Sequence, residues 1–287
     1  MSFPYVISHE KLNLYISVLD ITSLYLHEET IPDILDQLAQ SIKKDGCLKH
    51  PVIVDDKTHV VLDGMHRVAA LEKLGYARIP VCLVDYENPT ITVGCWYRTI
   101  KGIKALEHVI SRPYQTGLTL EEVNEVDDEK LGVLPVAAAI KSLEKSFFVC
   151  SPFRNLKEAY DVIKRIEERL KRSGFEVAYE TELDALSKLR EQNVDAVLLT
   201  PKLTKSAIIS TALSGSVFSY KATRHVIPAR PLDLDVPLNL LKDSKKPLEE
   251  VNEELRQMLQ KRRLRRVAAG SVIKGRRYEE DLYLFEE

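Results

Sequence analysis

Hydrophobic and polar residues follow two different periods along the chain, which predicts a mixture of strands and helices. Residues 14–20 alternate with the period of two of a half-buried strand. Residues 31–44 carry apolar side chains three and four apart, with Thr30 as the expected N-cap and Gly46 as the stop, and therefore predict a helix. The same criteria predict a helix over 68–74 and strands over 52–54, 58–62, 79–86 and 91–99. Residues from about 12 to 100 are thus expected to form one α/β unit.

The second half of the chain also alternates between strand and helix patterns. Predicted helices cover residues 103–110, 156–173, 182–192, 204–214 and 248–266. Predicted strands cover residues 136–140, 146–150, 175–179, 195–199 and 282–285. The fold class is therefore expected to be mixed α/β, with an N-terminal nucleotide-binding domain over residues 1–105 and a C-terminal α/β substrate domain over residues 106–287. We expect the active site in a cleft between these domains.

Composition excludes several classes of protein. A chain of 287 residues with 45% hydrophobic and 29% charged residues is typical of a globular protein with length for about two domains. The net charge of −2 provides no general attraction to nucleic acid. No apolar run approaches the roughly 20 residues of a membrane span, and the first residues lack a signal-peptide pattern. These features predict a cytoplasmic protein without a membrane partner, and they leave its oligomeric state open.

The turn from Asp63 to Arg67 is the most informative segment for chemistry. It reads Asp-Gly-Met-His-Arg and joins a predicted strand to a predicted helix. The first amides of a helix, together with His66 and Arg67, would attract phosphate. An acid such as Asp63 fits beside phosphate where a divalent cation or a hydroxyl lies between them. The pattern favours a phosphoryl-transfer site, and the alternative is an ordinary turn in which Asp63 caps the helix.

Three further sites supply candidate residues. Glu28 precedes the first helix of the N-terminal domain, where it is either a partner of the helix dipole or the carboxylate that deprotonates an alcohol. The run Thr223-Arg224-His225 could bind a carboxylate or a phosphate, or form a basic surface patch. Trp96 is either a packing residue or part of a pocket.

These motifs resemble the ParB/sulfiredoxin superfamily over residues 19–86. Within it, the chain is most similar to the free L-serine kinases of archaea, which make O-phospho-L-serine for cysteine biosynthesis, and to their bacterial relatives in siderophore pathways. Trp96 and the segment 223–228 carry the similarity to the kinases beyond the ParB-like part. Between about 105 and 210 the similarity is limited to the order of elements.

The resemblance implies a role for each candidate residue. Glu28 would be the base toward the serine hydroxyl, and Asp63 would support Mg²⁺ and the reacting phosphoryl group. Nucleotide phosphates would be held by the turn, at Asp63, Gly64, Met65, His66 and Arg67. L-Serine would be held by Trp96, Thr223, Arg224 and His225. The phosphoryl donor would be the adenine nucleotide ATP or ADP.

One position departs from the kinase pattern, and one charged run suggests a rival function. The archaeal turn often reads Asp-Gly-His-His-Arg, and Met65 here replaces its first histidine, so the choice between ATP and ADP stays open. The basic run from Lys261 to Arg266 would suit a ParB-like protein that binds DNA and uses nucleotide as a switch. The overall acidity disfavours nucleic acid as a partner. A sulfiredoxin-like reductase would need a cysteine in the turn, where Met65 stands.

Overall fold

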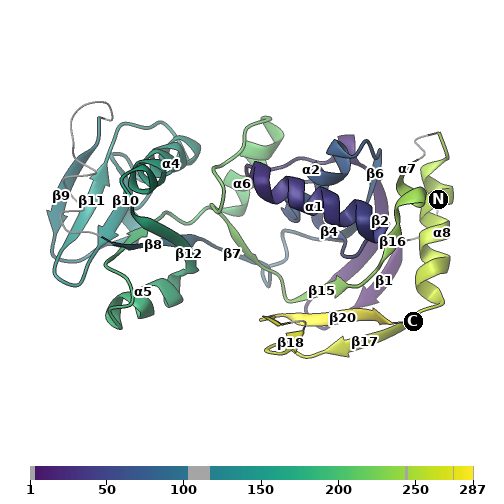
Figure 1. The fold of residues 1–287 in the computed structure, drawn as a ribbon. Coiled ribbons are helices and arrows are strands. Elements are labelled where there is room, and N and C mark those ends of the chain that lie inside the picture. The colour runs from purple at the N-terminus through teal and green to yellow at the C-terminus, as the bar shows by residue number, and fades with distance from the viewer. Residues whose placement is uncertain (1–3, 103–116, 243–244, 274, 287) are drawn as a thin grey trace. The chain divides into compact units, whose positions relative to one another are not determined.

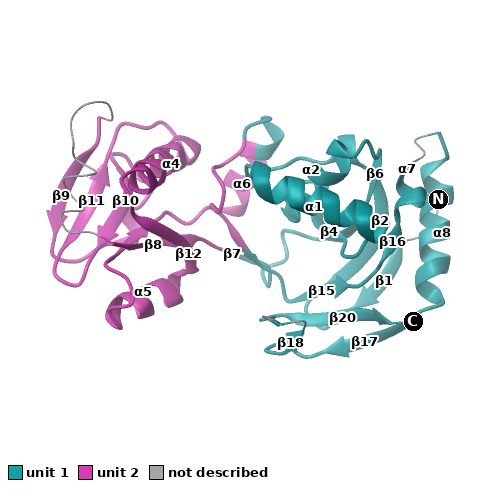
Figure 2. Cartoon of the chain, viewed as in Figure 1, with its two compact units in different colours: residues 1–92, 212–216, 225–287 teal, residues 93–211, 217–224 magenta. Residues whose placement is uncertain are grey.

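The computed structural model describes residues 4–102, 117–242, 245–273 and 275–286, and Figure 1 labels most of their helices and strands. The chain forms two compact units, coloured separately in Figure 2. Unit 1 comprises Met1–Thr92, Ala212–Ser216 and His225–Glu287, and unit 2 comprises Val93–Thr211 and Val217–Arg224. Both units contain helices and strands, which confirms the expected mixed α/β class. The predicted helix over 103–110 lies outside the described residues.

The division into units differs from the expected boundary after residue 105. Strand β8 (Trp96–Lys101) is an interior strand of the sheet of unit 2, so this unit begins before residue 105. The C-terminal segment belongs to unit 1, because helix α8 (Leu248–Gln260) is fastened to strand β2 (Asn13–Asp20). Asn252 of α8 accepts hydrogen bonds from the Val18 amide at 2.6 Å and the Ser17 hydroxyl at 2.7 Å. The backbone of β2 is thus completed by a side chain from the far end of the sequence.

Unit 1 is built on a five-stranded sheet in the order β1-β2-β6-β4-β5. Its strands are β1 (Tyr5–Ser8), β2, β4 (Val52–Asp55), β5 (Val61–Asp63) and β6 (Arg78–Val84). Strands β4 and β6 run parallel, and the other pairs are antiparallel. All four residues of β4 are buried, as expected of an interior strand. Asp63 therefore lies at the end of an edge strand of this sheet.

Helices α1 (Pro32–Asp45) and α2 (Met65–Lys73) contact each other beside this sheet. Helix α1 begins with Ile31 rather than Thr30 at the N-cap, and no side chain of the described residues caps it. Proline fits the first turn because its fixed φ suits a helix and it lacks only an amide hydrogen that would have no partner there. Gly46 ends the helix in the left-handed conformation with φ of 70°. Short elements η1 (Ile21–Ser23) and β3 (Cys47–Leu48) flank α1.

The C-terminal part of unit 1 contains a second, three-stranded sheet in the order β15-β20-β17. These strands are β15 (Ala229–Leu232), β17 (Arg263–Val267) and β20 (Asp281–Glu286). The remaining short elements here are β16 (Val236–Pro237), α7 (Leu238–Lys242), β18 (Val272–Ile273) and β19 (Arg276–Arg277). The predicted helix over 248–266 was wrong beyond Gln260, because the basic run leaves the helix and pairs as β17 with β20.

Unit 2 contains a six-stranded sheet in the order β12-β8-β13-β10-β11-β9, in which all neighbouring strands run antiparallel. Its strands are β8, β9 (Thr119–Val123), β10 (Val136–Lys141), β11 (Ser146–Cys150), β12 (Glu176–Thr181) and β13 (Ala196–Leu199). Its helices are α4 (Leu156–Arg172), α5 (Glu182–Arg190) and most of α6 (Lys205–Leu213), with the short η2 (Asp128–Lys130). The chain passes between the units within β7 (Thr92–Gly94) and β14 (Arg224–Val226).

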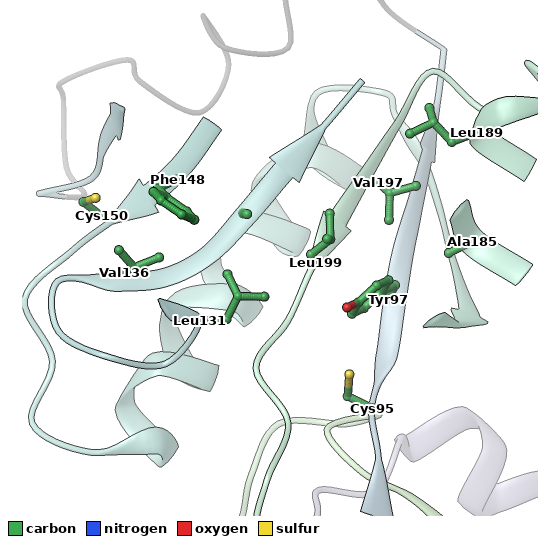
Figure 3. Close-up of a cluster of buried hydrophobic side chains, with 11 residues drawn as sticks. Cys95, Tyr97, Leu131, Val136, Phe148, Cys150, Ala185, Leu189, Val197 and Leu199 are labelled. Atoms are coloured by element: carbon green, nitrogen blue, oxygen red, sulfur yellow. The ribbon is translucent and has the colours of Figure 1, made fainter. Parts of the chain in front are cut away.

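A cluster of buried hydrophobic side chains supports the sheet of unit 2, as Figure 3 shows. Tyr97 of β8, Phe148 of β11 and Leu199 of β13 belong to it. Cys95 lies in the same cluster, and burial raises the pKa of its thiol to about 12. Burial likewise raises the pKa of Cys82 in unit 1 to about 12, so neither thiol has the lowered pKa of a reactive cysteine. Both cysteines are buried and carry free thiols. Across the part of the chain that the structure covers, no helix has the length and apolar character of a membrane span.

Candidate active site

The loop that carries Glu28 runs along strand β5 of unit 1. The Val61 amide donates to the Tyr25 carbonyl at 2.9 Å, and Tyr25 forms a parallel bridge with Val60. The His27 Nδ1–H then donates to the Val61 carbonyl at 2.7 Å. Since these bonds use the backbone of β5, the loop and the strand form one continuous structure up to residue 27.

The same loop is fastened again on the other side of Glu28. The Ile31 amide donates to Nε2 of His66 at 3.0 Å, and His66 lies in the first turn of α2. Glu28 therefore lies between two attachment points, one on β5 and one on α2. The turn from Asp63 to Arg67 joins these two elements, so the local chain path brings Glu28 beside that turn.

His27 and Glu28 are both buried in unit 1, with 0% and 6% of their surfaces exposed. Their nearest charged atoms, His27 Nε2 and Glu28 Oε1, lie 3.9 Å apart. Burial lowers the pKa of His27 below its usual range, and the negative charge of Glu28 offsets only part of that effect. His27 is therefore neutral near pH 7, and it holds the loop through its ring nitrogen without a competing positive charge beside the carboxylate.

Gly64 forms the N-cap of α2 with φ of 105°. A Cβ atom at this position would lie 2.7 Å from Val52 Cγ1 and 2.8 Å from Arg67 Nη2, so the turn has room only for glycine. Because glycine has no side chain, it cannot cap the first amides of the helix itself. The expected alternative, in which Asp63 caps α2, does not hold here, since Asp63 precedes the N-cap residue.

Asp63 accepts hydrogen bonds from two arginines on the same carboxylate oxygen. Arg67 Nη2 lies 3.0 Å from Asp63 Oδ2, and Arg230 Nη1 lies 2.7 Å from it. Arg230 also pairs with Glu280, whose Oε1 lies 2.5 Å from Arg230 Nε. The adjacent charges of Asp63 and Glu280 raise the pKa of Arg230 despite its burial. The guanidinium of Arg67 additionally donates to the carbonyls of His50 and Pro51, so it holds the turn against the start of β4.

Arg230 was missed by sequence reasoning, although a signal was present. It stands between Ala229 and Pro231 in an otherwise apolar strand, β15, where an arginine is seldom buried without a partner. Its partner lies 167 positions away along the chain, which no local pattern reveals.

His225 of unit 1 is far from His27 in the sequence but contacts it in the structure. The two imidazole rings meet edge to face with centroids 5.3 Å apart, and His225 Nε2 is hydrogen-bonded to the Tyr86 hydroxyl at 2.7 Å. Burial raises the pKa of Tyr86, so its hydroxyl stays protonated. Unit 1 thus contains the five predicted positions of the Asp63–Arg67 turn together with Glu28 and His225. Met65 lies half-buried in the first turn of α2 and offers no polar atom comparable to a histidine.

The other predicted residues meet in unit 2. The Trp96 indole N–H donates to the Thr223 carbonyl at 2.9 Å, and the Lys221 ammonium lies 4.2 Å from the centroid of the indole ring. Trp96 therefore lies on a strand and also contacts the backbone of the 223–225 motif.

The cleft that the sequence predicts between the two domains stays a prediction.

Glu182 is a second residue that sequence reasoning missed, at the start of α5 in unit 2. A Cβ atom on Gly94 would lie 3.3 Å from Glu182 Oε2 and 3.6 Å from Arg224 Nε, so both side chains border the backbone of this glycine. Glu182 also pairs with Lys202 at 3.5 Å. A carboxylate and a guanidinium next to one backbone position can match the two opposite charges of an amino acid.

Comparisons with known proteins show which family the chain is similar to. The model of the ParB N-terminal domain matches residues 8–93, which confirms the expected superfamily for this part. The ATP-dependent L-serine kinase of Staphylothermus marinus is 30% identical over 236 residues, covering 78% of this chain and 90% of the relative. The chain belongs to the L-serine kinase family.

Other members of the L-serine kinase family show where this chain is similar and where the family varies. The ADP-dependent L-serine kinase of Thermococcus kodakarensis is 29% identical, over 78% of this chain and 91% of the relative. A solved structure of a free serine kinase in complex with AMP is 28% identical, has a TM-score of 0.68, and matches 84% of this chain and 97% of its own. Because the two named relatives use different donors, membership in the L-serine kinase family does not by itself fix ATP or ADP.

Proposed function

We propose that this chain is a free L-serine kinase, which transfers a phosphoryl group from ATP or ADP to the serine hydroxyl and releases O-phospho-L-serine. The observation that carries the proposal is the double attachment of the Glu28 loop, to β5 through His27 and to α2 through His66, in a member of the L-serine kinase family. A carboxylate held beside a glycine turn at a helix N-terminus suits the transfer of a phosphoryl group to an alcohol. The product would serve as a precursor for cysteine biosynthesis.

The nucleotide phosphates would bind to the turn from Asp63 to Arg67. The amides of Gly64, Met65 and His66 begin helix α2, where the helix dipole is positive and favours an anion. His66 accepts a hydrogen bond from the Ile31 amide. Arg67 donates to Asp63 and to the two carbonyls before β4. We therefore assign the phosphate contacts mainly to backbone amides, with Arg67 and Arg230 adding positive charge nearby.

The residues of the turn also fit a magnesium ion. Mg²⁺ bound to a nucleotide takes most of its ligands from phosphate oxygens and water, and needs only one or two protein carboxylates. Asp63 lies at the turn and would supply that carboxylate, while the hydrogen bonds from Arg67 and Arg230 orient it. The ion, when bound, would offset negative charge on the phosphates.

L-Serine would be held by Trp96, Thr223, Arg224 and His225. The guanidinium of Arg224 suits the serine carboxylate, and Glu182, which borders the same glycine, suits the ammonium group. Glu28 would take the proton from the serine hydroxyl. At the same time the serine oxygen would bond to phosphorus, and the bond between phosphorus and the leaving nucleotide would break. Neutral His27 keeps the Glu28 loop in place during this step without pairing its carboxylate with a fixed positive charge.

The proposed activity can be tested by incubating the full chain with Mg²⁺, either ATP or ADP, and a panel of L-serine, L-threonine and L-homoserine. We expect O-phospho-L-serine to be the main product by ³¹P NMR and mass spectrometry. Phosphorylation of threonine or homoserine in preference to serine would replace the proposed substrate. No phosphorylated amino acid with either nucleotide would reject the proposal.

A nucleotide-switched DNA-binding protein is the second candidate, favoured by the ParB-domain match. The basic run on which it depends is largely engaged within unit 1. Arg262 donates to the carbonyls of Asp233, Leu234 and Phe285, Arg265 pairs with Glu286, and Arg266 pairs with Asp281. Measuring DNA affinity as salt rises would separate the candidates, since a phosphate-binding surface loses affinity steeply with salt.

Replacing Gly64 by alanine should weaken nucleotide binding to the turn. The new methyl group would meet Val52 Cγ1 and the Arg67 guanidinium, and alanine disfavours φ of 105°. We expect affinity for ADP or ATP, measured by calorimetry, to fall by at least about tenfold, because the amides would lose their alignment. Gly75→Ala is the matched control, since Gly75 also has positive φ but nothing lies within 4 Å of its Cβ position. Equal losses in both variants would contradict the assignment.

A further inference from the structure

Four consecutive backbone carbonyls in unit 2 accept hydrogen bonds from side chains of other elements. We call residues 220–223 the carbonyl segment; they are Tyr220, Lys221, Ala222 and Thr223. Arg98 donates to the first two carbonyls at 3.3 and 3.1 Å. The Tyr160 hydroxyl donates to the third at 3.0 Å, and the Trp96 indole donates to the fourth at 2.9 Å. Every residue of the carbonyl segment is therefore fixed by a side chain from another element.

The arginine in this arrangement is completely buried, with 0% of its surface exposed. Its charge is balanced by Glu167 of α4, which also accepts a hydrogen bond from the Tyr179 hydroxyl at 2.7 Å. The Arg98 guanidinium lies 5.2 Å from the centroid of the Tyr179 ring. Burying an ion pair costs desolvation energy that hydrophobic side chains of similar volume would not. Its presence here is better explained by what the guanidinium holds than by stability alone.

Tyr160 fastens the carbonyl segment to a second loop of unit 2. Its single hydroxyl hydrogen is shared between the Ala222 carbonyl and the Pro201 carbonyl, which lies 2.6 Å from the hydroxyl oxygen, and its ring meets Phe218 edge to face at 5.7 Å. Tyr160 is fully buried, so its hydroxyl is shielded from water. The segment therefore has little freedom to move relative to helix α4.

We propose that Arg98 and Tyr160 are positioning residues that, together with the Trp96 indole, fix the carbonyl segment and so set the direction of Thr223 and Arg224 toward L-serine. The inference rests on the proposed function for the role of Thr223 and Arg224. Arg98 and Tyr160 act through the backbone of the segment, and neither is assigned a contact with L-serine or with nucleotide. Their loss should therefore weaken serine binding and leave nucleotide binding to the Asp63–Arg67 turn unchanged.

Tyr160→Phe is the most direct test, because it removes one hydroxyl and keeps the buried ring. We expect the KM for L-serine to rise about five- to tenfold, with the Kd for ADP within about twofold of the original, since one fixed hydrogen bond to the segment is lost. Arg98→Lys keeps a positive charge for Glu167 but loses the forked donors, and should raise the serine KM further. If Arg98→Lys does not fold, Tyr160→Phe still decides the outcome.

Tyr97→Phe is the matched control. Tyr97 is a buried tyrosine of unit 2 that belongs to the hydrophobic cluster of Figure 3, and among the described residues the side-chain donors to the carbonyl segment are Arg98, Tyr160 and Trp96. This variant should keep the serine KM of the unaltered chain. A Tyr160→Phe chain with an unchanged serine KM, or with serine and nucleotide affinities weakened together, would overturn the proposal.

Tryptophan fluorescence provides a readout that does not depend on the activity. Trp96 is the single tryptophan of the chain, and its indole is one of the donors to the segment. Tyr160→Phe should increase quenching of Trp96 by acrylamide, whereas Tyr97→Phe should not. Increased quenching in a chain that phosphorylates no serine would support the fixed segment and reject the proposed substrate. Unchanged quenching would overturn the positioning role whatever the substrate.

Discussion

Glu28→Gln is expected to lower kcat for serine phosphorylation by about 10²–10⁴-fold, the usual contribution of a general base. Glutamine has nearly the same shape as glutamate but cannot accept the proton of the hydroxyl. Binding of ADP or ATP should be preserved, because the phosphates are assigned to the turn at the start of α2. Steady-state kinetics and calorimetry on the same preparation measure the two effects separately.

Glu29→Gln is the control for this prediction. Glu29 is the next residue of the same loop and is partly exposed, whereas Glu28 is buried next to His27. The control should keep turnover within about threefold, as is usual for substitutions without a part in the chemistry. Near-normal turnover in Glu28→Gln, or an equal loss in the control, would remove Glu28 from the role of base.

The local features of unit 1 could be predicted from the sequence because short-range physics determines them. Asp-Gly between an apolar strand and an amphipathic helix produced the expected strand, turn and helix around Asp63. The helix after Thr30 also formed, with its stop at Gly46. Its N-cap moved by one residue to Ile31, a difference within the usual uncertainty of helix ends.

Long-range pairing explains what the sequence did not reveal. The basic run after Gln260 has the composition of a helix surface, but Arg263–Val267 becomes a strand because β20 provides a partner for its backbone. In the same way, Asn252 completes the edge of β2, and this places the C-terminal segment in unit 1 instead of a separate domain. Propensity is a weak guide where such tertiary contacts decide the structure.

The candidate site shows the same division between local and distant signals. The turn and Glu28 were identified from motifs, whereas Arg230 and Arg98 were not, because each acts on a residue far away in the sequence. Arg98 is fully buried and Arg230 is half-buried, and their guanidinium groups fix other groups: Arg230 fixes the Asp63 carboxylate, and Arg98 fixes the carbonyl segment. An arginine in an apolar strand without a local acidic partner is therefore a useful signal in this chain, even though its target cannot be read from the sequence.

Asp63→Asn should have an effect comparable to that of Glu28→Gln, with a loss of about 10³-fold in kcat/KM for serine phosphorylation. Asparagine keeps an oxygen that can accept from Arg67 and Arg230, but it lacks the charge that the proposed magnesium ion requires. Nucleotide affinity measured with Mg²⁺ should fall toward the value measured without it. If added Mg²⁺ strengthens nucleotide binding as much in Asp63→Asn as in the unaltered chain, Asp63 does not support the metal.

Arg230→Gln separates this chemical role of Asp63 from a structural one. It breaks the same ion pair from the other side, and it leaves both Asp63 and Glu280 without the Arg230 guanidinium. If Asp63 contacts the reacting groups, Asp63→Asn should lose far more activity than Arg230→Gln for a similar decrease in melting temperature. If the ion pair serves only to hold β15 against the turn, the two variants should lose activity in proportion to their loss of stability. The ratio of the two activities thus tells whether the carboxylate acts on the phosphoryl group or only supports the fold around it.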